Sequence, residues 1–93
     1  MAAISLSDCK IYKRTEGDVE SYFIQTPATA DSADTVDITA IRSGRNYLNV
    51  EGFDATTGDN VTATVVPATD VVTLDAAGGT TNHVYVVQAN FVR

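Results

Sequence analysis

Residues 47–66 read YLNVEGFDATTGDNVTATVV, and this stretch decides the fold class. Apolar and polar side chains alternate with period two along residues 47–54 and again along residues 60–66, which is the pattern of half-buried strands. Between them, residues 54–59 form a polar loop in which Gly58 supplies backbone freedom and aspartate supplies turn chemistry. The stretch therefore predicts an antiparallel β-hairpin.

Downstream of this hairpin the same alternation continues. Residues 70–74 predict a short strand, residues 75–79 a turn, and residues 82–92 a long strand. The long strand has apolar side chains on both faces, which predicts a central position in a sheet or a cover supplied by a neighbouring subunit. Tyr85 and Phe91 are expected in the core.

Upstream, residues 35–40 predict a half-buried strand whose inward side chains include Ala40. Residues 9–14 and 19–26 are less regular, and we expect strands there with a turn at 15–18. Phe23, in the second of these strands, is expected to fill the core. The chain then has about seven short strands with turns every eight to twelve residues, which favours an antiparallel β-sandwich or barrel.

The length of 93 residues suits one small domain. Within it, residues 1–14 are expected to form an N-terminal arm and the first strand, and residues 15–93 the β-sandwich body. No stretch approaches the length of about 18 apolar residues that a membrane helix needs. The first residues lack the basic and apolar segments of a signal peptide, so we expect a soluble protein made in the cytoplasm.

Acidic residues outnumber basic ones by 12 to 6, which gives a formal charge of −6. Nucleic-acid binding needs a basic face that neutralises phosphates, so we expect no nucleic-acid partner. The basic residues are few and scattered: Lys10, Lys13, Arg14, Arg42, Arg45 and Arg93.

Reactive side chains are scarce. His83 and Cys9 are single residues of their kind and stand in no catalytic motif. We therefore expect no enzyme and no cofactor, with His83 at the rim of a strand and Cys9 as a half-buried side chain. A structural zinc site needs four ligands, which His and Cys cannot supply here. Residues 54–59 could offer calcium ligands, but a polar hairpin loop is the simpler interpretation, and the question stays open.

Three segments stand out for their composition and for the spacing of their strands. They are DTVDI at 34–38, ATTG at 55–58, and the stretch from VTL to VYVV at 72–87. With its acidic composition, the chain resembles the small head decoration, or cement, proteins of tailed bacteriophages over residues 19–92. The resemblance implies a structural virion protein on the capsid surface that binds the major capsid protein, or another virion protein, and reinforces the shell. A homo-oligomer such as a trimer is compatible with it.

Other functions remain open at this point. A tail or head–tail connector protein is the nearest variant of the virion hypothesis. A small ligand- or carbohydrate-binding β-module would need an aromatic platform, and calcium at 54–59 could accompany it. A small enzyme built on His83 is the third alternative.

The residues expected to contact a partner fall into two groups. The first contains aromatic side chains that are expected to share a strand face with polar residues, and the second contains the basic residues of the N-terminal arm, whose charge would suit an acidic partner surface. These residues are Tyr12, Tyr47, Phe53, Lys10, Lys13 and Arg14.

Overall fold

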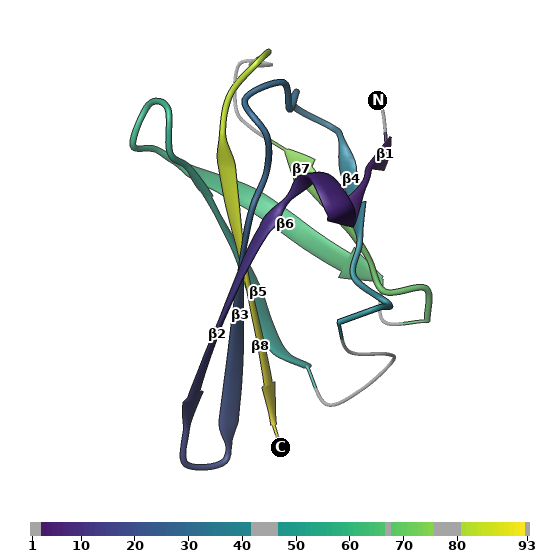
Figure 1. Cartoon of the computed structure of the whole chain (residues 1–93), viewed down its shortest axis with the longest axis vertical. Helices are drawn as coiled ribbons and strands as arrows, with labels where there is room; N and C mark the ends of the chain where they lie inside the picture. Colours follow the sequence, from purple (N-terminus) through teal and green to yellow (C-terminus); the bar gives the residue numbers. More distant parts are fainter. Residues whose placement is uncertain (1–2, 42–46, 67, 76–80, 93) are drawn as a thin grey trace.

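The computed structural model describes residues 3–41, 47–66, 68–75 and 81–92. This part of the chain forms one curled sheet with the strand order β1-β4-β7-β6-β5-β8-β3-β2, so the predicted all-β fold is confirmed (Figure 1). The elements are β1 (Ala3–Ile4), the 3₁₀ turn η1 (Leu6–Asp8), β2 (Lys10–Glu16), β3 (Val19–Gln25), β4 (Thr35–Asp37), β5 (Tyr47–Asp54), β6 (Asn60–Val66), β7 (Val71–Asp75) and β8 (Tyr85–Val92). No helix in these described ranges is long and apolar enough to cross a bilayer.

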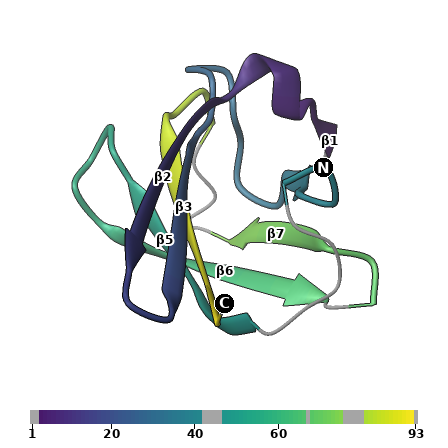
Figure 2. The same ribbon diagram turned by 60° about the horizontal axis from the view of Figure 1, so that its bottom comes forward.

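The sheet folds over on itself into two layers. Strands β2, β3, β8 and β5 form one layer, and β6 and β7 cross them steeply with β4 alongside (Figures 1 and 2). All neighbouring pairs are antiparallel except β1 with β4. Strands β5 and β6 pair only at Gly52 with Val61 and at Phe53 with Asn60, so the sheet bends where these two strands diverge. Such a bend lets one sheet cover its own apolar face.

Gly52 makes the crossing of β5 and β6 possible. A Cβ atom added at Gly52 would lie 2.7 Å from Val61 Cγ2 and 2.8 Å from the Val61 backbone oxygen. Its φ angle lies outside the left-handed region, so the requirement for glycine here is one of space and not of backbone conformation.

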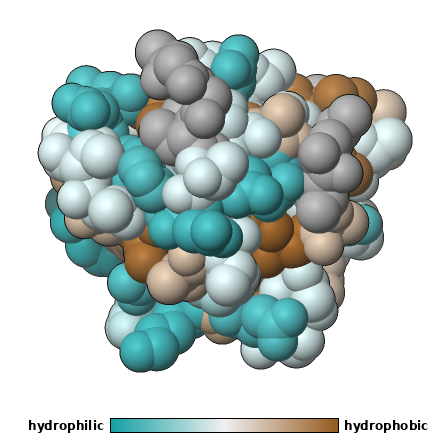
Figure 3. Space-filling model, turned by 90° about the horizontal axis from the view of Figure 1, so that it is seen from above, coloured by the Kyte–Doolittle hydropathy of each residue, from teal (hydrophilic) through white to brown (hydrophobic). Residues whose placement is uncertain are grey.

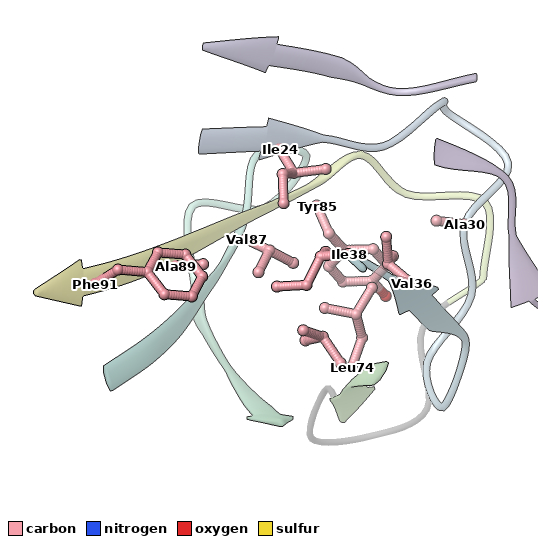
Figure 4. Packing of buried hydrophobic residues seen from close by; sticks show 10 residues of the cluster. Ile24, Ala30, Val36, Ile38, Leu74, Tyr85, Val87, Ala89 and Phe91 are labelled. Carbon is pink, nitrogen blue, oxygen red and sulfur yellow. The ribbon is translucent and has the colours of Figure 1, made fainter. Parts of the chain in front are cut away.

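The core lies between the two layers. In Figure 4, Ile24 from β3 and Val87 from β8 point toward Val36 from β4 and Leu74 from β7. Apart from the carboxylate of Asp54, the largest fully buried side chains are hydrophobic, and they are Tyr85, Phe91, Ile24, Ile38, Leu74, Val36, Val72 and Val87. Tyr85 and Phe91 are thus in the core, as the alternation of their strand predicted.

The predicted central hairpin is present with the predicted bounds. Strand β5 ends at Asp54, and strand β6 begins at Asn60. In the connecting loop the Asp54 carboxylate accepts hydrogen bonds from the backbone N–H groups of Thr56 (2.9 Å) and Thr57 (3.2 Å). Gly58 has a φ angle of 85°, which an L side chain adopts only under strain.

Several predicted bounds were wrong. Strand β4 ends at Asp37, because the Asp37 carboxylate accepts the Thr39 N–H at 2.9 Å and turns the chain, and Ala40 is exposed instead of inward. Strand β8 begins at Tyr85 and not at residue 82, since Asn82 has a φ angle of 56°. The first hairpin turns over Gly17 and Asp18 alone, so β2 runs on to Glu16.

Some predictions fall on parts of the chain that the structure does not describe. The described residues exclude 76–80, and with them all but the first residue of the predicted turn at 75–79. Arg42, Arg45 and Arg93 also lie outside them. The predicted long strand is central, as expected, because β8 lies between β5 and β3.

Candidate functional site

The strand register defines an outer face on the layer formed by β2, β3, β8 and β5. Tyr12 pairs with Phe23, Phe23 with Gln88, and Gln88 with Glu51. Directly paired residues share a face, so these four side chains form a row across the four strands. The neighbouring residues in the register, such as Ile24, lie on the opposite, buried face.

A second row lies beside the first. Lys10 pairs with Gln25, Gln25 with Val86, Val86 with Phe53, and Phe53 with Asn60. It continues the outer face as far as the start of β6. The two rows together place three aromatic rings, from β2, β3 and β5, on one side of the sheet.

A groove lies between the aromatic rings on this face. It has a volume of about 350 Å³. The lining residues are Phe23, Glu51, Gly52, Phe53, Asn60, Val86 and Gln88, and we call this the outer-face groove. An adjoining hollow of about 330 Å³ shares Glu51, Gly52 and Asn60 with it, where β5 and β6 diverge. The groove combines aromatic rings with carboxylate and amide groups, which is the chemistry of a binding surface.

A third row holds this face rigid through side-chain hydrogen bonds. Ser21 Oγ donates to Asn90 Oδ1 at 2.6 Å, and Asn90 Nδ2 donates to Asn49 Oδ1 at 2.6 Å. Gln88 Nε2 also donates to Asn90 Oδ1, at 3.1 Å. Ser21 and Asn90 are buried, and their polar groups are satisfied by these hydrogen bonds. The hydrogen-bonded row therefore gives the neighbouring groove a fixed shape.

Four of the six predicted contact residues lie on this outer face. Lys10, Tyr12 and Arg14 alternate along β2 on the outer face, and Phe53 closes the far side of the groove. Tyr12 is 57% exposed and Phe53 is 42% exposed. The Arg14 guanidinium lies 5.5 Å from the centre of the Phe23 ring, and Arg14 Nε lies 3.1 Å from Glu16 Oε1. The outer face therefore carries aromatic rings and is locally basic along β2.

Lys13 lies on the other side of β2, since it falls between Tyr12 and Arg14 in the strand. Its ammonium group is 3.7 Å from Glu20 Oε2 and 5.8 Å from the centre of the Tyr22 ring. It shares the strand with the outer-face residues but not their face.

Tyr47 also lies on the inner side, which contradicts the face assignment from alternation. The register between β5 and β8 shifts between Tyr47 and Asn49, and this bulge turns Tyr47 toward the core. Its ring packs on Phe91 with a centroid distance of 4.7 Å, and its hydroxyl donates to Asp70 Oδ1 at 2.6 Å. Burial, the hydrogen bond to Asp70 and the negative charges of Asp70 and Asp37 raise the pKa of the Tyr47 phenol.

Phe23 differs from its prediction in the opposite sense. It was expected in the core, but it lies half-buried on the outer face in register with Tyr12. The signal was present in the sequence, because Phe23 alternates in phase with the polar residues Ser21 and Gln25. Glu51 and Gln88, which line the same groove, were not singled out as candidate site residues either.

A histidine–aspartate pair joins the β5–β6 loop to the segment before β8. His83 Nδ1 lies 2.7 Å from Asp54 Oδ2, and Asp54 is only 1% exposed. Burial alone would raise the pKa of the Asp54 carboxyl. The hydrogen bonds from His83 and from the Thr56 and Thr57 N–H groups, with the charge of His83, outweigh burial and hold the pKa below its usual range. Asp54 thus joins two segments that are distant in the sequence.

We predict that Asp54→Asn changes the pH dependence of folding. A carboxyl whose pKa is lower in the folded state stabilises the fold above the unfolded pKa of about 3.9, and this stabilisation is lost as the pH falls through the folded pKa. The difference in free energy of unfolding between wild type and variant should therefore be largest above pH 5 and shrink toward about pH 2.5. Urea denaturation across this range measures it. Asp75→Asn, at an exposed position in β7, is the control, and a pH-independent difference for Asp54→Asn would contradict the assignment.

Other polar candidates have local partners. The Cys9 thiol donates to the Ser5 carbonyl at 3.6 Å, and burial followed by the negative charge of Asp8 raises the pKa of the thiol. A thiol with a raised pKa is a weak nucleophile. Within the ranges that the structure describes, no three His, Cys, Asp or Glu side chains gather closely enough to hold a metal ion. The oxygens of Asp54 already accept hydrogen bonds from the protein.

The end of the molecule that lies at the top of Figure 1 has a mixed surface. Figure 3 shows hydrophobic residues there as small separate areas among hydrophilic ones.

Comparison of the chain with protein-family models, with curated proteins and with solved structures gives no match. The outer-face groove and its neighbouring basic residues are therefore the strongest candidate site on geometric grounds alone.

Proposed function

We propose that this protein is a non-catalytic structural component of a bacteriophage virion, and that it decorates the head shell by binding the major capsid protein through its outer face. The observation that carries the proposal is that Tyr12, Phe23 and Phe53 lie on one face of the sheet, with the rings of Tyr12 and Phe53 exposed. Interfaces of proteins are enriched in aromatic side chains and arginine. Lys10 and Arg14 border the rings and suit an acidic partner surface.

Folding stability and conformational entropy both favour the binding of a protein partner. A domain of this size has a narrow margin of stability, and a partner that binds only the folded state adds to it. The hydrogen-bonded row of Ser21, Asn90 and Asn49 holds the face in one shape before binding, so little conformational entropy is lost on contact. The added stability and the small loss of conformational entropy both support a protein that functions by binding to other protein subunits.

Binding to phage heads tests the proposal. Heads that lack this protein are mixed with purified protein and sedimented, and the bound copy number is expected to match the symmetry of the shell. Tyr12→Ser combined with Phe53→Ser should weaken binding about tenfold or more, because hot-spot residues contribute over about 1 kcal/mol each. Val66→Ser removes an apolar side chain that is 51% exposed on β6 and should leave binding unchanged.

The outcome also separates the virion locations. Saturable binding to tails or to the head–tail connector, with heads left bare, would replace head decoration by the connector variant of the proposal. Failure to bind any particle, with the protein folded, would contradict a virion role. Light scattering of the purified protein decides whether it binds as a trimer or as a monomer.

A carbohydrate-binding module is the second candidate, and the outer-face groove favours it. The rings of Phe23 and Phe53 border the groove, while Glu51, Gln88 and Asn60 offer hydrogen-bonding groups to hydroxyls. A glycan array read with wild type and with Phe53→Ser distinguishes the two functions. Retention of a glycan that Phe53→Ser abolishes, together with no binding to particles, would establish the module instead.

A further inference from the structure

Strand β2 forms a long and regular edge of the sheet. It pairs with β3 at seven consecutive positions, from Lys10 with Gln25 to Glu16 with Val19, without a bulge. In the described part of the chain it has no strand on its other side, and all seven of its residues are exposed. Proteins commonly blunt such edges by shortening, bulges, proline or charged side chains, and of these devices β2 has only the charged side chains.

The backbone groups of every second residue of β2 are directed away from β3. The β2–β3 hairpin turns over Gly17 and Asp18, and Gly17 alone has a positive φ angle, of 57°, as in a type II′ turn. The residues that flank a two-residue turn exchange both backbone hydrogen bonds, so Glu16 bonds to Val19. The alternate residues Thr15, Lys13 and Ile11 then present their N–H and C=O groups at the open edge.

Apolar side chains stand on both faces beside this edge. Ile11 is 43% exposed on the inner side, and Tyr12 is 57% exposed on the outer side. A strand added next to β2 would cover part of both, since directly paired side chains lie about 5 Å apart. The edge therefore offers hydrogen bonds and apolar contact together.

The charge of β2 selects what can pair with it. The strand carries Lys10, Lys13 and Arg14 against one acidic residue, Glu16, on a chain whose formal charge is −6. Two copies of β2 side by side would bring two basic strands together, and an antiparallel register centred on Lys13 would place the two Lys13 residues opposite each other. Like charges in that position are destabilising, whereas an acidic strand would be attracted.

We propose that β2 is the acceptor edge for an extended acidic segment of the partner protein, which adds to the sheet as a new strand beside β2. The proposal deepens the proposed function and rests on it, because it assumes that the partner is a protein. Backbone hydrogen bonds to Ile11, Lys13 and Thr15 supply the geometry, and carboxylates opposite Lys10, Lys13 and Arg14 supply the selectivity. Strand β1, at the other edge, is only two residues long and offers no comparable site.

The test uses the full-length protein and a capped peptide as long as β2, with glutamate at the positions that would pair with Lys10, Lys13 and Arg14 and valine at the others. Saturating peptide should slow amide hydrogen exchange of Ile11, Lys13 and Thr15 about tenfold or more and leave the amides of β6 unchanged. The same peptide N-methylated at the residues whose N–H groups would face β2 keeps its charges but loses those backbone donors, and it should not bind. Equal binding of both peptides would show a purely electrostatic contact and overturn strand addition.

Matched variants separate charge at the edge from charge in general. Lys10→Gln with Lys13→Gln lowers the net charge by two and should weaken the peptide about tenfold. Thr62→Glu with Thr64→Glu lowers it equally at exposed positions of β6 and should have less than about a twofold effect. Equal loss in both variants would overturn the proposal.

The outcome of the peptide experiment can be distinguished from the outcome of the particle-binding experiment that tests the proposed function. Binding to heads that depends on Tyr12 and Phe53, with no protection of β2 by the acidic peptide, would overturn strand addition and leave the proposed function standing. Peptide protection of β2 without any particle binding would support the acceptor edge and overturn the virion role. Protection of the same amides in a dimer of the free protein would make a second copy the occupant and overturn the acidic segment.

Discussion

Phe91→Ala is expected to lower the free energy of unfolding by about 3–5 kcal/mol, the range for removal of a large buried aromatic side chain. Phe91 is fully buried, and its ring lies 4.7 Å from the ring of Tyr47 and 5.8 Å from that of Tyr22. Its removal leaves a cavity between three strands. Urea denaturation followed by circular dichroism measures the loss.

The matched control is Phe53→Ala, the same chemical change on the outer face. Because Phe53 is 42% exposed, its removal should cost about 1 kcal/mol or less. For a small domain with a stability near the low end of about 5–15 kcal/mol, the first variant should keep about 2 kcal/mol or less, whereas the second should keep most of its stability. Equal losses in the two variants would contradict the division of the sheet into a buried and an outer face.

Gly52→Val is the second variant with a large expected effect. The added Cβ would meet the backbone oxygen and the side chain of Val61 at less than 3 Å, so β5 and β6 must move apart where the sheet bends. Overpacking of this kind costs about 1–3 kcal/mol, and contact with backbone atoms places this case at the upper end. The melting temperature and the free energy of unfolding measure it.

Gly58→Ala controls for glycine loss without a steric clash. A Cβ at Gly58 meets no atom within 4 Å, and its cost arises from the φ angle of 85° alone. That cost is about 1 kcal/mol. A smaller loss for Gly52→Val than for Gly58→Ala would contradict the close crossing of β5 and β6. Since Gly52 also lines the outer-face groove, the same residue is required by the bend of the sheet and by the shape of the candidate site.

Local pattern was sufficient for much of the fold. The alternation in residues 47–66 predicted β5, β6 and the loop between them, because a strand with one buried face imposes a period of two on its own sequence. The apolar content of both faces of β8 likewise predicted its central place between β5 and β3. Tyr12 and Phe53 were expected to be exposed because they share a strand face with polar residues, and both are.

The errors arise where one residue shifts the register or where a sheet face has no cover. Tyr47 was assigned to the polar face by simple alternation, but the bulge beside it turns its side chain inward. Phe23 was assigned to the core because it is large and apolar. Its strand pairs with β8 in a register that places it opposite Gln88, on the face that the second layer does not cover.

Composition and periodicity are properties of short segments, and they settled that this chain forms strands and where its central hairpin turns. The side of the sheet that β6 and β7 cover depends on the bend at Gly52 and Val61, which brings together residues far apart in the sequence. That bend decides which aromatic rings form the core and which form the outer-face groove. The position of β2 at an edge is decided by the order of all the strands in the sheet, which no short segment of the sequence contains.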